Sequence, residues 1–364
     1  MNYKFLILTF FTIMLLFYGY HQGMYVAPQE QTMGEIQRIF YYHVPSAWTS
    51  FLCFFANFIA SIVYLARRKS SPAAGLAADA VAVSTAEVGV VFCTIVLVTG
   101  PLWARPVWGI WWTWDARLTT TLILWLIYVS YLFLRHYAAG GQAPTLASVV
   151  AIIGFLDVPL VYMAIRWFRT QHPQPVMAGG EGSGLAPEMW TALLWNWAAF
   201  IAFGFLLIWM RYNLARFHQH LDERYAMAAL EGREADVAVG SSAPAVRTEG
   251  KAIASFVLAV LSLLFLTIWP VFGIPAIVLG EIALSKIRKS GHRLKGERLA
   301  VVALTLGYLT LLLFIARAVV GFPLSDPRLA YMATWLIHIG YIVFLTQKSG
   351  GLEREFEELE RGQK

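Results

Sequence analysis

Long apolar runs separated by short polar segments dominate the sequence. A transmembrane α-helix needs about 20 predominantly apolar residues. Ten runs reach or approach that length: residues 5–20, 47–66, 84–102, 118–134, 145–166, 190–210, 252–269, 271–285, 299–316 and 330–346. Because lipid offers backbone amides no hydrogen bonds, each run is expected to fold as a helix. The pattern predicts an all-α fold, a polytopic integral membrane bundle of about ten transmembrane helices, with a six-span core followed by extra spans.

Composition supports a membrane protein and excludes a soluble globule, since 58% of the residues are hydrophobic and only 14% are charged. The formal net charge of +6 is modest and lies mainly on one side of the predicted membrane, so it does not indicate nucleic-acid binding. Cys53 and Cys93 both lie inside apolar runs, where buried packing is the default for a free thiol.

The basic residues predict the orientation. We expect a cytoplasmic N-terminus, because the segments on its side contain Arg67, Arg68, Lys69, Arg135, Arg211, Arg216 and the basic stretch 286–298. The opposite segments still contain Arg38, Arg105, Arg117, Arg166 and Arg169. Residues 5–20 are interpreted as an uncleaved span, since no small-x-small cleavage site follows them. This topology places His43, the segment 108–115 and His172 on the outer side.

The segment 108–115 contains four of the chain's 14 tryptophans: Trp108, Trp111, Trp112 and Trp114. An aromatic belt at the membrane interface explains a single Trp, but not this cluster followed by Asp115 and flanked by Arg105 and Arg117. If the segment is helical, Trp108, Trp111, Trp112 and Asp115 share one face. Indole planes and guanidinium groups suit a large, flat, apolar ligand that carries anionic groups.

The string Trp-Gly-Ile-Trp-Trp-Thr-Trp-Asp-Ala-Arg-Leu-Thr at residues 108–119 resembles the tryptophan-rich signature of the haem-handling membrane proteins that assemble c-type cytochromes. Its ending, Asp-Ala-Arg-Leu-Thr, resembles the CcmC family, the haem exporter protein C of cytochrome c maturation. The resemblance covers about residues 1–215. It implies a multi-pass protein of the bacterial inner membrane that handles haem on the periplasmic face and is not an enzyme. No Cys-x-x-Cys-His motif is present, so covalent haem attachment of the c type is not expected.

The resemblance also implies roles for particular residues. His43, in Tyr-His-Val-Pro, and His172 are expected to ligate the iron of a non-covalently bound haem b in transit. The remaining expected haem-binding residues are Trp108, Trp111, Trp112 and Trp114 as a stacking platform, Arg105 and Arg117 at the propionates, and Asp115, which orients a ligand group or pairs with an arginine. The implied partners are the haem chaperone CcmE, the ABC-type transporter CcmA/CcmB and membrane lipid.

Four regions are predicted. Residues 1–216 form the CcmC-like six-span core, and residues 217–251 form a cytoplasmic linker that contains a possible amphipathic helix. Residues 252–320 form a Gly/Leu-rich membrane module, similar to a module of unknown function seen in many bacterial proteins. Residues 328–364, one span followed by a charged helix, resemble CcmD, the small single-span partner of CcmC, here fused to the same chain.

Two alternatives remain open from the sequence. A haem lyase that attaches haem to apocytochrome c would show further histidines within its spans and a large outer domain. A non-haem transporter or scaffold would use the aromatic segment only as a membrane anchor. Polar residues inside the spans are expected to be paired or functional: Asn57 and Asn196 as hydrogen-bonding groups between helices, Glu87 and Asp157 with partners that the sequence does not identify, and His338 as a docking or packed residue.

Overall fold

The computed structural model describes residues 3–137, 142–174, 184–230, 247–248, 250–264, 269–289, 294–295, 297–320 and 326–362. The chain divides into two compact units. The first contains Met1–Tyr225 together with Ser325–Gln363, and the second contains Ala226–Leu324. In the described part, the regular structure is helical except for two paired strands of two residues each.

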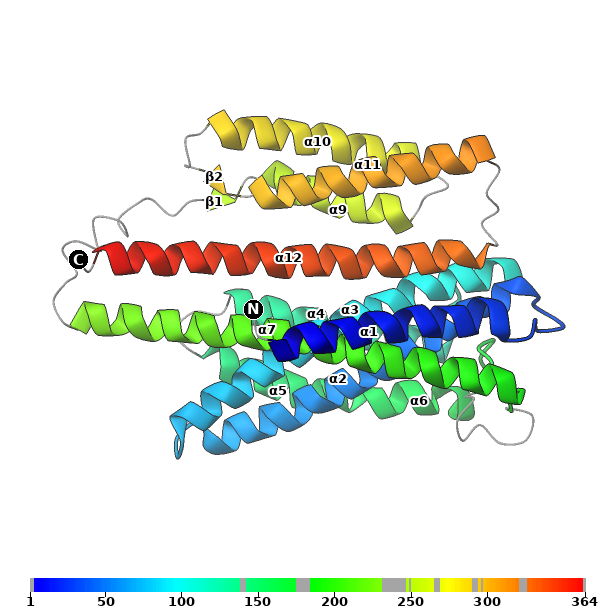
Figure 1. Ribbon diagram of the computed structural model, residues 1–364, viewed down its shortest axis with the longest axis horizontal. Helices are drawn as coiled ribbons and strands as arrows, with labels where there is room; N and C mark the ends of the chain where they lie inside the picture. The colour runs from blue at the N-terminus through cyan, green and yellow to red at the C-terminus, as the bar shows by residue number, and fades with distance from the viewer. Residues whose placement is uncertain are drawn as a thin grey trace. The chain divides into compact units, whose positions relative to one another are not determined.

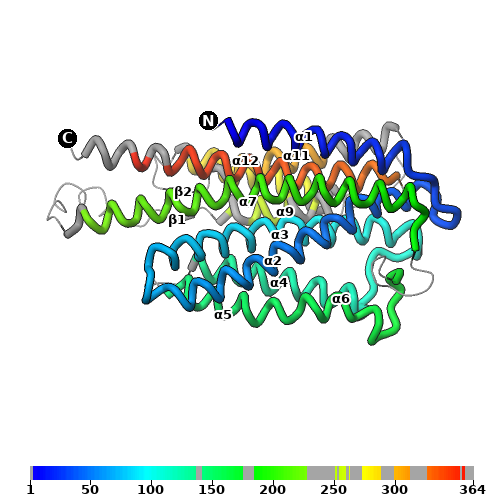
Figure 2. Tube along the Cα trace, turned by 60° about the horizontal axis from the view of Figure 1, so that its bottom comes forward, coloured from blue at the N-terminus to red at the C-terminus, as the bar shows by residue number. Residues whose placement is uncertain are grey.

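The first unit contains a bundle of long helices (Figures 1 and 2). Its elements are α1 (Tyr3–His21), a π-helical turn η1 (Gln22–Val26), a 3₁₀ helix η2 (Glu35–Ile39), α2 (Phe40–Arg67), α3 (Pro72–Trp108), α4 (Ala116–Tyr137), α5 (Ala143–Phe155), α6 (Asp157–Trp167), α7 (Pro187–Leu230) and α12 (Pro327–Gly362). The predicted linker therefore begins inside a helix, because α7 continues unbroken to Leu230.

The second unit contains α9 (Gly250–Leu264), α10 (Trp269–Lys289) and α11 (Glu297–Val320). Its strands β1 (Arg247–Thr248) and β2 (Leu294–Lys295) pair in parallel. The three helices pack through small residues, with Ala259, Ala276 and Ala303 fully buried. Residues 231–246, most of the predicted linker, lie outside the described residues.

Seven helices among the described residues are long and apolar enough to cross a membrane. They extend over Tyr3–Val26, Glu35–Arg67, Pro72–Trp108, Ala116–His136, Ala143–Trp167, Pro187–Met227 and Pro327–Leu352. These are the six core spans and the last span expected from the apolar runs, which confirms the all-α polytopic fold. The other three expected runs fall in the second unit, where Leu299–Leu311 forms a shorter apolar helix.

Three polar residues inside the first unit, Asn57, Asn196 and Glu87, make contacts between helices, which lowers the cost of placing them in hydrocarbon surroundings. Asn57 Nδ2 donates to the carbonyl of Ala82 at 2.7 Å, and Asn196 Nδ2 donates to the carbonyl of Gly19 at 2.7 Å. Both asparagines therefore join two helices, as expected. Glu87 accepts from Arg211 Nε at 2.7 Å, an ion pair between α3 and α7 that the sequence did not predict.

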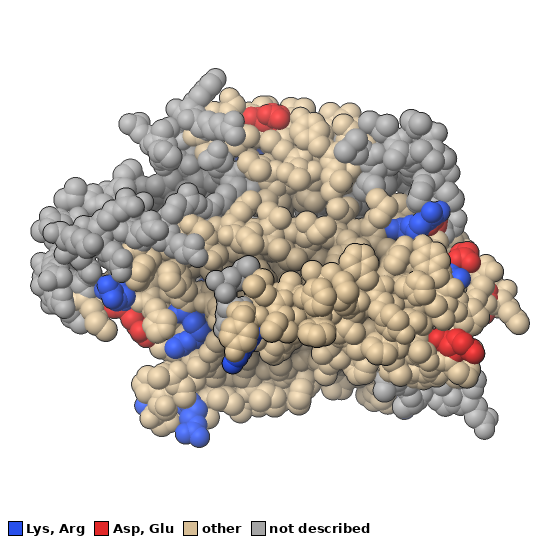
Figure 3. All heavy atoms as spheres, viewed as in Figure 1, with Lys and Arg blue, Asp and Glu red and all other residues tan. Residues whose placement is uncertain are grey.

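The alternation of helix directions brings distant segments together. The start of α2, the end of α3, the start of α4 and the end of α6 all lie at one end of the first unit, which we call the site end (right in Figures 1 and 2). On the face seen in Figure 3, most charged side chains of described residues lie toward the left and right ends, and the surface between them is largely uncharged. The expected outer-side groups are thus neighbours in space.

Candidate functional site

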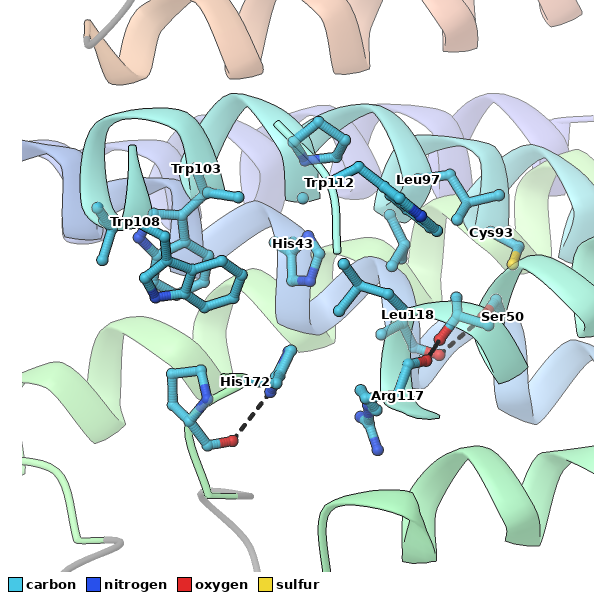
Figure 4. A pocket seen from close by; sticks show the side chains of 18 of the residues that line it. His43, Ser50, Cys93, Leu97, Trp103, Trp108, Trp112, Arg117, Leu118 and His172 are labelled. Carbon is cyan, nitrogen blue, oxygen red and sulfur yellow. Dashed lines mark hydrogen bonds between the residues drawn. The ribbon is translucent and has the colours of Figure 1, made fainter. Parts of the chain in front are cut away.

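A pocket opens at the site end of the first unit (Figure 4). Its lining comes mainly from α2, α3, α4 and the chain that follows α6, with Met33 before η2 and Trp112 between α3 and α4. Most of the wall is apolar, and the polar or aromatic groups on it are His43, Ser50, Phe51, Cys93, Trp103, Trp108, Trp112, Arg117, Thr121 and His172. Both histidines that the sequence singled out therefore face the same pocket, although 129 positions separate them in the chain (172 − 43).

His43 lies one turn into α2 and is only 8% exposed. Its Nδ1 lies 2.8 Å from Thr99 Oγ1 on α3. The hydroxyl of Thr99 donates to the carbonyl of Ile95 at 2.7 Å, so its single proton is already used. Thr99 must therefore accept, His43 Nδ1 carries the proton, and Nε2 presents an unprotonated lone pair to the pocket.

His172 reaches the same tautomer by a different contact. Its Nδ1 lies 2.9 Å from the carbonyl oxygen of Pro173, which can only accept a hydrogen bond. The proton is therefore on Nδ1, and Nε2 is again free to bind a metal. Burial, together with the nearby charge of Arg117, lowers the pKa of His172 to about 4, so the imidazole is neutral at physiological pH.

The tryptophan segment is not helical, which corrects the expectation of one shared helical face. Gly109 ends α3 with a left-handed φ of 77°, and its N–H donates to the carbonyl of Arg105 at 3.1 Å. Trp108 and Trp112 line the pocket, whereas Trp111 is 38% exposed and Trp114 is 76% exposed, both outside the lining. The four indoles are therefore divided: Trp108 and Trp112 line the pocket, and Trp111 and Trp114 are exposed outside the lining, in a part of the segment that we call the rim.

Trp103 is a wall residue that the sequence analysis missed. Its ring lies edge-on to the imidazole of His43, with centroids 5.8 Å apart, and it lines the pocket beside Trp108. The sequence did hold a signal, since Trp103 precedes the cluster by little more than one helical turn. At the other side of the wall, the edge of Trp114 packs against Trp112 at 5.7 Å.

Asp115 organises the backbone around the site. Its Oδ1 accepts from the N–H of Leu118 at 2.9 Å, which caps the start of α4. Its Oδ2 accepts from the N–H of Gln171 at 3.3 Å and from Thr113 Oγ1 at 3.4 Å. Asp115 therefore makes its side-chain hydrogen bonds with these three groups and with neither Arg105 nor Arg117. The bond from Gln171 also holds the residue next to His172.

The two arginines occupy different places. Arg117 lines the pocket, and its Nη1 donates to the carbonyl oxygens of Val161 at 2.5 Å and Tyr162 at 3.4 Å, in the middle of α6. It is the one Lys or Arg among the described lining residues. Arg105 lies outside the lining and donates to the carbonyl of Gly109, beyond the end of α3. Arg117 is therefore the cation placed to meet an anionic group in the pocket.

The cavity is narrow, at about 90 Å³, whereas small-molecule sites usually enclose roughly 300–1,000 Å³. A macrocycle enters only if part of the wall moves outward. Residues 110–115 belong to no regular element, and Ile110, Trp111 and Trp114 among them are exposed, so no helical hydrogen bonds hold this part of the wall. The imidazoles themselves are held by their Nδ1 contacts.

Other candidate residues lie away from the pocket. His338, on α12, is 1% exposed and packs among the rings of Phe92, Phe200, Phe203 and Trp335, so it helps α12 to dock against α3 and α7. Asp157 is 8% exposed where α5 gives way to α6. Cys53 and Cys93 are free and buried, as expected, but Cys93 differs from the others because it lines the pocket.

Two family models match two separate parts of the chain. Residues 2–227 match the family model described as heme exporter protein C, and residues 251–317 match a domain of unknown function, DUF4190. The heme exporter protein C of Bradyrhizobium diazoefficiens is 34% identical over 215 residues, 58% of this chain and 77% of that protein. The heme exporter protein C of Escherichia coli K12 is 32% identical over 211 residues, 56% of this chain and 78% of that protein.

A relative from outside the bacteria is similar over a shorter stretch. It is the "putative cytochrome c biosynthesis ccmC-like mitochondrial protein" of Marchantia polymorpha, 34% identical over 178 residues, or 49% of this chain and 73% of that protein. Both histidines and the tryptophan segment fall inside the residues that match the family model.

Proposed function

The chain belongs to the heme exporter protein C family of cytochrome c biogenesis, and from this membership and the pocket we propose that it binds haem b non-covalently between His43 and His172. The observation that carries the proposal is that both imidazoles line the same pocket and place Nδ1 2.8–2.9 Å from a hydrogen-bond partner. The tautomer assigned from these contacts has the proton on Nδ1 and leaves Nε2 free to bind iron. Neutral imidazole is a common axial ligand of haem iron.

The rest of the lining suits haem as a cargo. Trp103, Trp108 and Trp112 offer indole surface to the apolar macrocycle, with a large contact area at a small entropic cost. Arg117 supplies a guanidinium group for a propionate, because charge-assisted hydrogen bonds to carboxylates are about twice as strong as neutral ones. Widening of the pocket by movement of residues 110–115 would admit the ring.

The rim of the pocket suits transfer to a partner. Trp111, Trp114 and Ile110 are exposed beside the pocket. Arg105 is also in this region, where it donates a hydrogen bond to the carbonyl of Gly109, the residue that follows α3. In the proposal this rim faces the periplasm, on the outer side of the bacterial inner membrane, and presents haem to the chaperone CcmE beside the transporter CcmA/CcmB. In this proposal the chain gives up the haem by exchanging its axial ligands and releasing its contacts with the wall, and acts as a carrier rather than as an enzyme.

The proposal is tested by visible absorption of the purified protein, with His43→Ala and His172→Ala compared with the wild type. His21→Ala is the matched control, because His21 is exposed at the end of α1 and does not line the pocket. We expect a Soret band with low-spin features in the wild type and in His21→Ala, and a weaker or shifted band in the two pocket variants.

Two results would contradict the proposal in different ways. A colourless wild type from haem-replete cells removes haem binding altogether. A haem-loaded wild type whose spectrum is unchanged by both pocket variants keeps the cargo but shows that the ligands are other residues.

A further inference from the structure

The start of α12 packs on the segment that leads into the His43 helix. Ala330 is fully buried against Ile36 and Ile39 of η2, and the same cluster reaches Trp103 and Val107 on the pocket wall. η2 ends at Ile39 and α2 begins at Phe40, so η2 fixes where the His43 helix starts. Figures 1 and 2 show α12 running along the other helices of the first unit.

Tyr331 makes the central contact of this packing. It is 4% exposed, and its hydroxyl donates to the backbone carbonyl of Arg38 at 2.7 Å. Its ring lies against Tyr42, the residue before His43, with centroids 3.9 Å apart, and edge-on to Tyr20 of α1 at 5.7 Å. One side chain of α12 therefore contacts both α1 and the first turn of α2.

Arg38 continues the chain of contacts on its other side. Its buried Nη1 donates to the carbonyls of Gly23 at 2.8 Å and Ala27 at 3.2 Å, and its Nε donates to Glu35 at 2.6 Å. The backbone of Arg38 is thus held from α12, while its side chain holds the turn after α1. A first helical turn lacks intrahelical partners for its N–H groups and opens easily unless tertiary contacts hold it.

We infer that Tyr331 and Arg38 are positioning residues for the haem ligand His43: together they fix the start of α2, so that its imidazole keeps the place that ligation needs. This inference rests on the proposed function. It assigns to α12 a role at the haem site, although α12 lies outside residues 2–227 that match the family model.

The test compares Tyr331→Phe with Tyr341→Phe. Both residues are buried on α12, and each loses one hydroxyl, but Tyr341 donates to Glu87 at 3.1 Å and does not line the pocket. Two readouts are taken on the full chain in detergent. The first is the Kd for haem from a Soret titration, and the second is hydrogen–deuterium exchange of residues 35–46 without haem.

We expect Tyr331→Phe to raise the Kd by about threefold to tenfold, the value of one net buried hydrogen bond, and to speed exchange at residues 35–46. Tyr341→Phe should leave both readouts as in the wild type. Unchanged exchange and Kd in Tyr331→Phe, or equal changes in the two variants, would overturn the inference. A wild type that does not bind haem would refute the proposed function and the ligand role with it, while the exchange data would still decide whether Tyr331 holds this segment.

Discussion

Thr99 offers the sharpest test of how His43 is prepared for iron. Thr99→Val keeps the shape of the side chain but removes the oxygen that accepts from His43 Nδ1 at 2.8 Å. The imidazole is buried, so no solvent replaces the lost partner. Its proton can then occupy either nitrogen, whereas iron binds only the tautomer with Nε2 free.

The size of the effect follows from these losses. If the two tautomers became equally populated, the competent fraction would halve, which alone weakens binding by about twofold. The lost hydrogen bond also frees the ring to rotate and lowers the basicity of Nε2. Removal of such outer partners typically costs 10–100-fold in metal affinity. We therefore expect the Kd of Thr99→Val for haem to rise by about 10–100-fold, or roughly 1.4–2.7 kcal/mol.

A Soret titration of the haem-free protein measures this Kd directly, and a redox titration of the bound haem reports the basicity of the ligand. Thr99→Ser is the control, because it restores the hydroxyl and should bind within about threefold of the wild type. If Thr99→Val bound haem within about twofold of the wild type with an unchanged spectrum and potential, the contact with Thr99 would be incidental. The tautomer argument for His43 would then fail.

Three further predictions concern the segment around the pocket. Asp115→Asn should keep the cap of α4, since Asn and Asp cap equally well. Asp115→Ala should lower the free energy of unfolding by about 1 kcal/mol, measured by denaturant titration, and should weaken haem binding, measured as the Kd from a Soret titration. Arg117→Gln should weaken binding of haem by about tenfold or more but hardly change binding of haem dimethyl ester, which lacks the propionate charge; equal losses for both ligands would place Arg117 elsewhere. Gly109→Ala should destabilise the chain by about 1–2 kcal/mol through its left-handed φ alone, since a Cβ there meets no neighbour; an unchanged apparent Tm would contradict this.

The spans could be predicted from the sequence because each depends on local hydrophobicity. Apolar runs give the positions of the seven helices among the described residues that can cross a membrane, and the string at 108–119 indicates the family. The break in helix at the tryptophan segment also has a signal in the sequence, although the Trp spacing alone predicts a continuous helical face. Gly109 followed by Asp115 is the usual order of a helix stop and a helix cap, which separates two helices rather than continuing one.

The neighbours of the two histidines could not be predicted in the same way. Thr99 approaches His43 from 56 positions away, and Tyr331 approaches Arg38 from 293 positions away. Such contacts depend on how the helices pack and leave no periodic signal in the sequence. In the sequence, Thr99 and Tyr331 resemble other residues of apolar helices, and only the fold places them beside the start of α2.

The two proposed ligands differ in how firmly they are held, and this difference gives haem transfer a direction. His43 is buried on a helix, with Thr99 behind it and Tyr331 bracing the turn before it. His172 lies in a segment without regular structure, and that segment is held by the backbone contact of Gln171 with Asp115 and by the carbonyl of Pro173. Groups with fewer buried contacts open at lower free-energy cost. In the proposed function the iron therefore exchanges His172 first, on the side of the exposed Trp111 and Trp114, while His43 retains the haem until a partner's ligand has replaced it.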